Sequence, residues 1–142
     1  MFSKGDFQFF DKAKEAAETS TYRPHHIGAV LVYHGMVIAS ASNSCKTNPV
    51  QKEYNRKYRV FRKSEKPIND SVHAEIACLL SVRQDIDWKK AKLYIYRICV
   101  GKPHGYGMAR PCEACMSFIK EKGIRKIFYT TDDGFAQERI DL

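Results

Sequence analysis

The second half of the chain alternates between helical and strand patterns, and this alternation restricts the possible folds more than any other feature. The segments are a helix at 71–83 capped by Asp70 or Ser71, a strand at 92–100, a helix at 111–122 and a strand at 124–130. Helix–strand units of this length favour parallel strands with the helices packed over the sheet. We therefore expect an α/β fold whose later strands are parallel.

The first half predicts a helix followed by a hairpin. Apolar residues recur at helical spacing in 9–17, and Ser3 or Asp6 is a suitable N-cap. Two short apolar runs, 27–33 and 36–40, then flank His34-Gly35, a pattern typical of a β-hairpin with a tight turn. The order predicts a three-layer α/β/α sandwich around a mixed sheet, with an N-terminal antiparallel hairpin and later parallel strands.

The composition indicates one globular domain in a reducing compartment. A chain of 142 residues that is 44% hydrophobic fits a single domain, 1–142, with one core. No stretch approaches the roughly 20 apolar residues of a membrane span, and residues 1–11 lack the apolar centre of a secretion signal. The chain has five cysteines, an odd number. We expect a cytoplasmic protein without membrane contact, in which closely spaced cysteines indicate a metal site before a disulfide.

A basic insertion at about 45–70 interrupts the pattern. It carries eight basic and three acidic residues, or +5 of the net charge of +8, and contains no clear secondary-structure element. Aromatic residues, Tyr54, Tyr58 and Phe61, alternate with the cations. Within 46–66 such a pattern suits the 5′-phosphate of a mononucleotide, a subunit contact or, as a second choice, single-stranded nucleic acid. A solvated surface loop is the plainest alternative.

Two short motifs carry the chemistry: His73-Ala74-Glu75 and Pro111-Cys112-Glu113-Ala114-Cys115 each open an expected helix. Cys112 and Cys115 share a helical face, and His73 can supply a third ligand to one ion. Three ligands leave one tetrahedral position open, as in catalytic zinc sites, although a structural zinc or buried thiols would use the same cysteines. Glu75 can then accept a proton from water, provided that the helix start brings positions 73 and 75 to one site.

The order His-x-Glu, then Pro-Cys-x-x-Cys, resembles the signature of the zinc nucleobase deaminases. Over about 27–130 the chain is similar to the cytidine and deoxycytidylate deaminase superfamily, which includes tRNA adenosine deaminases. The resemblance implies that His73, Cys112 and Cys115 bind Zn²⁺ and that Glu75 shuttles protons. It also implies that Ala74 lies against the base and that Asn43 contacts the sugar, although Asn43 could instead be a turn former.

The remaining candidates are less specific. Arg110 adjoins the second motif and could bind an anion or pair with a carboxylate such as Glu113. His104, in a glycine-rich loop, could touch a substrate or a second metal. Cys78 follows a helical stripe and is expected in the core. The remaining histidines lie near turns and are expected at the surface: His25, His26 and His34.

These observations predict a zinc-dependent hydrolytic deaminase. Its expected substrate is cytosine in a free (deoxy)cytidine nucleoside or monophosphate, with water attacking C4 and ammonia leaving. One alternative is the same reaction on cytosine or adenine in single-stranded DNA or RNA, including tRNA. Another is a non-catalytic zinc fold that binds nucleic acid. A homo-oligomer is expected because relatives self-associate and the insertion is rich in aromatic residues.

Overall fold

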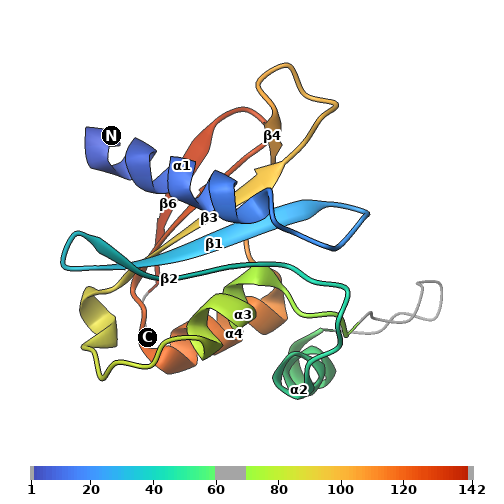
Figure 1. The fold of residues 1–142 in the computed structure, drawn as a ribbon. Coiled ribbons are helices and arrows are strands. Elements are labelled where there is room, and N and C mark those ends of the chain that lie inside the picture. The colour runs from blue at the N-terminus through green and yellow to red at the C-terminus, as the bar shows by residue number, and fades with distance from the viewer. Residues whose placement is uncertain (1, 60–69, 141–142) are drawn as a thin grey trace.

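The computed structural model describes residues 2–59 and 70–140, which form one mixed sheet between two layers of helices (Figure 1). The helices are α1 (Lys4–Ala17), α2 (Pro49–Tyr58), α3 (Ala74–Leu80) and α4 (Glu113–Lys122), with a 3₁₀ turn at Trp88–Lys90. The strands are β1 (His26–Tyr33), β2 (Met36–Ser42), β3 (Lys92–Ile98), β4 (Tyr106–Gly107), β5 (Lys126–Thr130) and β6 (Phe135–Arg139). This is the α/β/α architecture that the order of elements predicts.

The sheet runs in the order β2-β1-β3-β5-β6, and the short β4 pairs with the end of β3. β1 and β2 form the expected antiparallel hairpin, and β3 and β5 form the expected parallel pair. In Figure 1, α1 covers one face of the sheet, while α3 and α4 cover the other and α2 lies beyond them. Among the described residues, none of the helices is both long and apolar enough to cross a membrane.

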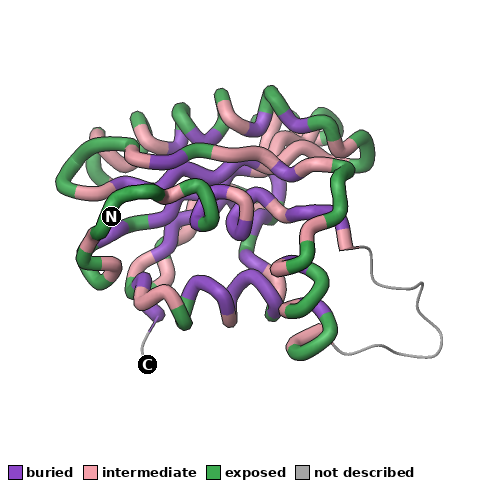
Figure 2. The backbone as a smooth tube through the Cα atoms, turned by 60° about the horizontal axis from the view of Figure 1, so that its bottom comes forward, coloured by how far each residue is buried: buried purple, intermediate pink, exposed green. Residues whose placement is uncertain are grey.

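Two apolar cores fill the spaces on either side of the sheet. Phe10 of α1 packs against Tyr94 and Phe128, whose rings stack at 4.3 Å between centroids. On the other face, apolar residues of α3 and α4 pack against the central strands. Figure 2 shows buried positions along the middle strands and exposed positions on loops and outer helical turns. The sheet is therefore a rigid platform, and the second core holds α3 and α4 at fixed positions on it.

The structure corrects the expected start of α3 and adds a strand after Thr131. There, a turn closed by the hydrogen bond from the Thr131 N–H to the Gly134 C=O brings β6 antiparallel to β5. The helix expected at 71–83 occupies only Ala74–Leu80, and its N-cap is His73 rather than Asp70 or Ser71. The residues before His73 are extended because they bond to the backbone of Ser44 and Lys46.

The basic insertion also holds an element that its sequence did not predict. α2 begins after Asn48, whose side chain accepts from the amides of Val50 and Gln51, with Pro49 at the first position. The sequence of α2 lacks the apolar periodicity that predicts a helix, because two of the residues that it buries, Gln51 and Asn55, are polar. Segment 60–69 of the insertion, with Phe61 and Arg62, lies outside the described residues.

Gly28 in β1 allows α1 to lie close to the sheet. A Cβ at this position would fall within 3.0 Å of backbone atoms of Ala13, Ala16 and Ala17. Because backbone cannot rotate away as a side chain can, we expect Gly28→Ala to destabilise the protein by about 1–3 kcal/mol or more. Denaturant unfolding measures this effect, with Gly101→Ala, where nothing lies within 4 Å, as the control. Equal stability of the two variants would contradict the close approach.

Candidate metal centre and active site

The three predicted metal ligands meet where α3 and α4 begin. His73 is the N-cap of α3, Cys112 is the N-cap of α4, and Cys115 lies in the first turn of α4. Their ligand atoms all lie within 4.8 Å of one another, with His73 Nδ1 at 3.2 Å from Cys115 Sγ and 3.6 Å from Cys112 Sγ. One imidazole and two thiols suit tetrahedral zinc and leave a fourth position for water or substrate. The donor set therefore fits zinc, and these residues are positioned to hold the ion.

The electrostatic surroundings favour thiolate at this position. The hydrogen bond from Cys115, helped by His73, lowers the pKa of the Cys112 thiol to about 4. The positive ends of the α3 and α4 dipoles act in the same direction. Cys115 is fully buried and its pKa is raised, chiefly because it is the donor to Cys112. Metal binding must therefore displace one thiol proton, so that zinc affinity falls as the pH falls.

Glu75 lies in the first turn of α3, beside the ligand cluster. Its side chain is 5% exposed, and burial raises the pKa of its carboxyl to about 7. His73 has the extended dihedrals φ −82° and ψ 154°, so the chain enters the helix only after it. This entry lets positions 73 and 75 line the same cavity, which a regular helix would prevent.

Two adjoining cavities open at the cluster. One, of about 140 Å³, is lined by Glu75, His73 and Cys112 together with Arg97 and Arg110. The second, of about 210 Å³, is lined by Tyr22, Arg59 and Ser71. His25, Asn43 and His73 border both cavities and join them.

Sequence reasoning missed several of these wall residues. His25 is half-buried on the cavity wall and not at the surface, and burial lowers the pKa of its imidazole. Arg97 and Tyr22 carry no local motif, and only the pairing of β1 with β3 brings Arg97 opposite Ile27, another wall residue.

Asn43 is buried and holds the cavity wall together. Its side-chain oxygen accepts from the Ser20 hydroxyl at 2.5 Å and from the Ile27 amide at 3.0 Å. Its side-chain nitrogen donates to the His25 carbonyl at 3.0 Å. An amide nitrogen carries two hydrogens, so within the described residues one N–H of Asn43 has no bond assigned to it. Ala74, the residue between His73 and Glu75, is completely buried.

Arg110 pairs with Glu138 of β6 and not with Glu113. Its Nε and one terminal nitrogen each lie 3.0 Å from a carboxylate oxygen of Glu138, which also accepts from the Tyr129 hydroxyl. This bidentate pair lowers the pKa of the Glu138 carboxyl. β6, which the sequence did not predict, therefore supplies the partner of Arg110.

The pH dependence of this pair has a definite sign. Because the pKa of the Glu138 carboxyl is lowered from its ordinary value of 4.5, the pair stabilises the folded protein at pH values above 4.5. This stability is lost as the pH falls through the lowered pKa. We expect Arg110→Gln to cost less than about 1 kcal/mol at neutral pH, because the pair is partly exposed, and nothing in acid. Denaturant unfolding at both pH values measures this, with exposed Arg125→Gln as the control. A difference that persists in acid would contradict the pairing.

The other candidates lie apart from the cluster. His104 is exposed and packs on the ring of Tyr106 at 4.0 Å between centroids. Cys78 is fully buried, as expected for a core residue, and burial raises the pKa of its thiol to about 12. All five cysteines are free thiols.

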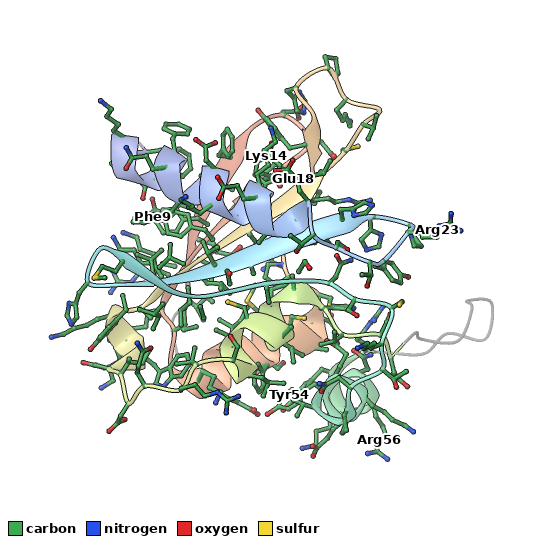
Figure 3. All side chains as sticks on the ribbon, viewed as in Figure 1. Phe9, Lys14, Glu18, Arg23, Tyr54 and Arg56 are labelled. Carbon is green, nitrogen blue, oxygen red and sulfur yellow. The ribbon has the colours of Figure 1, made fainter. Side chains whose placement is uncertain are left out.

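The aromatic residues of α2 face inward. Tyr54 and Tyr58 both donate hydrogen bonds to Glu121 of α4, and Tyr54 packs edge-on against Phe118. In Figure 3, Tyr54 lies on the side of α2 toward α4, and Arg56 points away from it. α2 therefore presents its cations Lys52, Arg56 and Lys57 outward and its tyrosines to α4, whereas Arg59, just after the helix, lines the larger of the two cavities.

A model of a known protein family matches most of the chain. The family model "Cytidine and deoxycytidylate deaminase zinc-binding region" matches residues 3–131. A search of curated proteins gives no match.

Two solved structures of a dCMP deaminase share the fold. The apo crystal structure of dCMP deaminase from the cyanophage S-TIM5 is similar with a TM-score of 0.61 and 19% identity, covering 92% of this chain and 86% of that one. The complex of that enzyme with dCMP and dUMP gives a TM-score of 0.61 and 18% identity, covering 92% and 84%. A structure from a study of tRNA:A34 deaminases gives a TM-score of 0.48 and 24% identity, covering 88% of this chain and 75% of that one. With the family match over most of its length, the chain belongs to the cytidine and deoxycytidylate deaminase family.

Proposed function

We propose that the protein is a zinc-dependent hydrolytic deaminase of cytosine in a free (deoxy)cytidine nucleoside or monophosphate. The observation that carries this proposal is a buried carboxyl, Glu75, in the same cavity as the metal ligands. A structural zinc site has no use for such a group, because burying a carboxyl is costly unless it has a task. Family membership supports the same chemistry.

In the proposed reaction, cytosine and water become uracil and ammonia. Zinc held by His73, Cys112 and Cys115 would supply a Lewis acid that brings the pKa of water to about 7. Glu75 accepts one proton of the water that attacks C4 and passes it to the ring nitrogen N3. It then takes the second proton from the hydroxyl now on C4 and delivers it to the departing amine, so that C4 keeps the water oxygen as a carbonyl and ammonia leaves. A carboxyl pKa of about 7 suits a group that must both take and give protons near neutral pH.

Two of the substrate contacts proposed from the sequence, Asn43 and Arg110, lie on the cavity walls. The remaining N–H of Asn43 would donate to the sugar, whereas Ala74, proposed to lie against the base, is completely buried and lines neither of the two cavities. Arg110 would contact the substrate from the wall of the smaller cavity, where Glu138 holds its guanidinium in place. Arg59, on the wall of the adjoining cavity, is suitably placed for a 5′-phosphate.

A second candidate is the same chemistry on cytosine or adenine in single-stranded nucleic acid, including tRNA. The net charge of +8 and the exposed cations of α2 favour it. It ranks second because Tyr54 and Tyr58 contact α4 and are not open to stack on bases. A zinc fold that only binds nucleic acid ranks third, since it leaves Glu75 unexplained.

The wider setting is part of the same proposal. The five free thiols support a reducing, cytoplasmic location. Self-association of single-domain chains belongs to the same proposal. Sedimentation measures the oligomeric state, and a monomer at all concentrations would refute that part.

The substrate is tested by ammonia release from the zinc-loaded protein. The panel contains cytidine, deoxycytidine, their monophosphates, adenosine, guanine and a cytosine-containing single-stranded oligonucleotide. Release from the cytosine nucleosides or monophosphates is expected, and preference for a monophosphate would assign Arg59 to its phosphate. Release from the oligonucleotide alone would establish the second candidate instead. No release by protein with one zinc per chain would leave the non-catalytic fold.

A further inference from the structure

The N-cap residue of α3 does not cap the helix with its side chain. An N-cap side chain normally accepts a hydrogen bond from the first helical turn, and this bond fixes the chain at the helix entrance. The N-cap here is His73, whose side chain makes no such bond in the described structure because it faces the two cysteines. Another group must therefore fix the backbone that aims this imidazole.

Gln51 of α2 contacts that backbone directly. The His73 amide donates to Gln51 Oε1 at 3.0 Å across 22 positions of sequence. The neighbouring backbone bonds pair Val72 with Ser44 and Lys46. Gln51 thus holds the next residue, the metal ligand itself.

A buried polar chain holds Gln51 in turn. Gln51 is 0% exposed, and its amide nitrogen donates to Asn55 Oδ1 at 2.9 Å. Asn55, also buried, donates to Asp70 Oδ1 at 3.1 Å, which returns the chain of bonds to the segment that leads into His73. A fully buried amide is costly unless its hydrogen bonds are made, and an apolar residue would pack there without that cost. The observed bonds thus point to a role in positioning.

We propose that Gln51 is a positioning residue of the metal centre, which holds the His73 backbone and so directs its imidazole toward Cys112 and Cys115. The inference rests on the proposed function only in taking this cluster as the zinc site. It makes α2, the helix of the basic insertion, part of the structure that sets metal affinity.

Gln51→Met tests the proposal, because methionine has a similar volume and accepts no comparable hydrogen bond. We expect zinc affinity, measured by chelator competition, to fall about tenfold. The absorption bands of the cobalt-substituted protein should also change, since they report ligand geometry. Tyr94→Phe is the control: it loses a hydrogen bond to Asp6 on the opposite face of the sheet. It should lower stability while leaving zinc affinity and the cobalt spectrum unchanged.

Gln51→Glu separates positioning from packing. Its carboxyl keeps an oxygen that can accept from the His73 amide but loses the donor to Asn55 Oδ1, so its zinc affinity should lie between those of the wild type and Gln51→Met. Unchanged affinity and spectrum in Gln51→Met, with only a lower melting temperature, would overturn the proposal. So would equal losses in Gln51→Met and Gln51→Glu.

Hydrogen exchange in the unsubstituted protein tests the contact without depending on whether a variant folds. In the zinc-loaded protein the His73 amide should exchange its hydrogen as slowly as core amides, and fast exchange would refute the contact. These measurements do not use turnover. A chain that is inactive on every substrate but loses zinc affinity in Gln51→Met would refute the proposed function and leave the role of Gln51 standing.

Discussion

Glu75→Gln is expected to abolish deamination while leaving zinc bound. The substitution keeps the size of the side chain and removes its ability to carry a proton between water, N3 and the leaving amine. Loss of general acid–base catalysis costs about 10²–10⁴-fold in kcat. Because the carboxyl is buried, the amide should leave the melting temperature equal or higher. Steady-state ammonia release, zinc content and thermal unfolding measure the three effects.

Glu113→Gln is the matched control for this prediction. Glu113 is the acidic residue in the first turn of α4 and is exposed, so its loss should change turnover little. If Glu75→Gln kept activity within about threefold of the wild type, Glu75 would not be the proton shuttle, because the loss would be far too small. Loss of zinc together with activity would show that Glu75 supports the metal site rather than the reaction.

Cys115→Ala is expected to remove zinc binding and the stability that zinc adds. Cys115 is completely buried and approaches His73 within 3.2 Å, so no surface group can replace its thiol. Free zinc at a thousand times the dissociation constant stabilises a folded protein by about 4 kcal/mol. The wild type should therefore melt at a higher temperature as zinc is added, whereas the melting temperature of the variant should not respond. Differential scanning calorimetry with and without zinc measures this.

Cys78→Ala separates metal loss from loss of packing. Cys78 is equally buried in α3 and lies outside the ligand cluster. This variant should lose stability as a small core truncation and still gain the full shift on adding zinc. A zinc-dependent shift that survives in Cys115→Ala would show that the ion binds elsewhere.

Elements with a strong local pattern could be predicted from the sequence. The hairpin of β1 and β2 follows from two apolar runs around His34-Gly35, and α4 ends at Gly123, which has the left-handed φ of 102° typical of a C-cap. Weak patterns were missed. α2 buries the polar Gln51, and β6 owes its place to pairing with β5 rather than to its own composition.

The site residues likewise fall into those that a local motif predicts and those that it does not. His73, Glu75, Cys112 and Cys115 lie in two short motifs whose spacing encodes the chemistry, and the fold brings them together. Wall and supporting residues come from distant segments. Arg97 reaches the cavity through strand pairing, and Gln51 reaches His73 across 22 positions. Their roles depend on tertiary contacts that no local spacing records.

The central claim, hydrolysis by water at C4, is tested most directly with isotopic water. The zinc-loaded protein is incubated with deoxycytidine and its monophosphate in H₂¹⁸O, and the products are analysed by mass spectrometry. The account predicts a uracil product that carries one ¹⁸O atom per molecule and one ammonia released for each. Ammonia without incorporated ¹⁸O, or unchanged substrate in the presence of fully bound zinc, would contradict it.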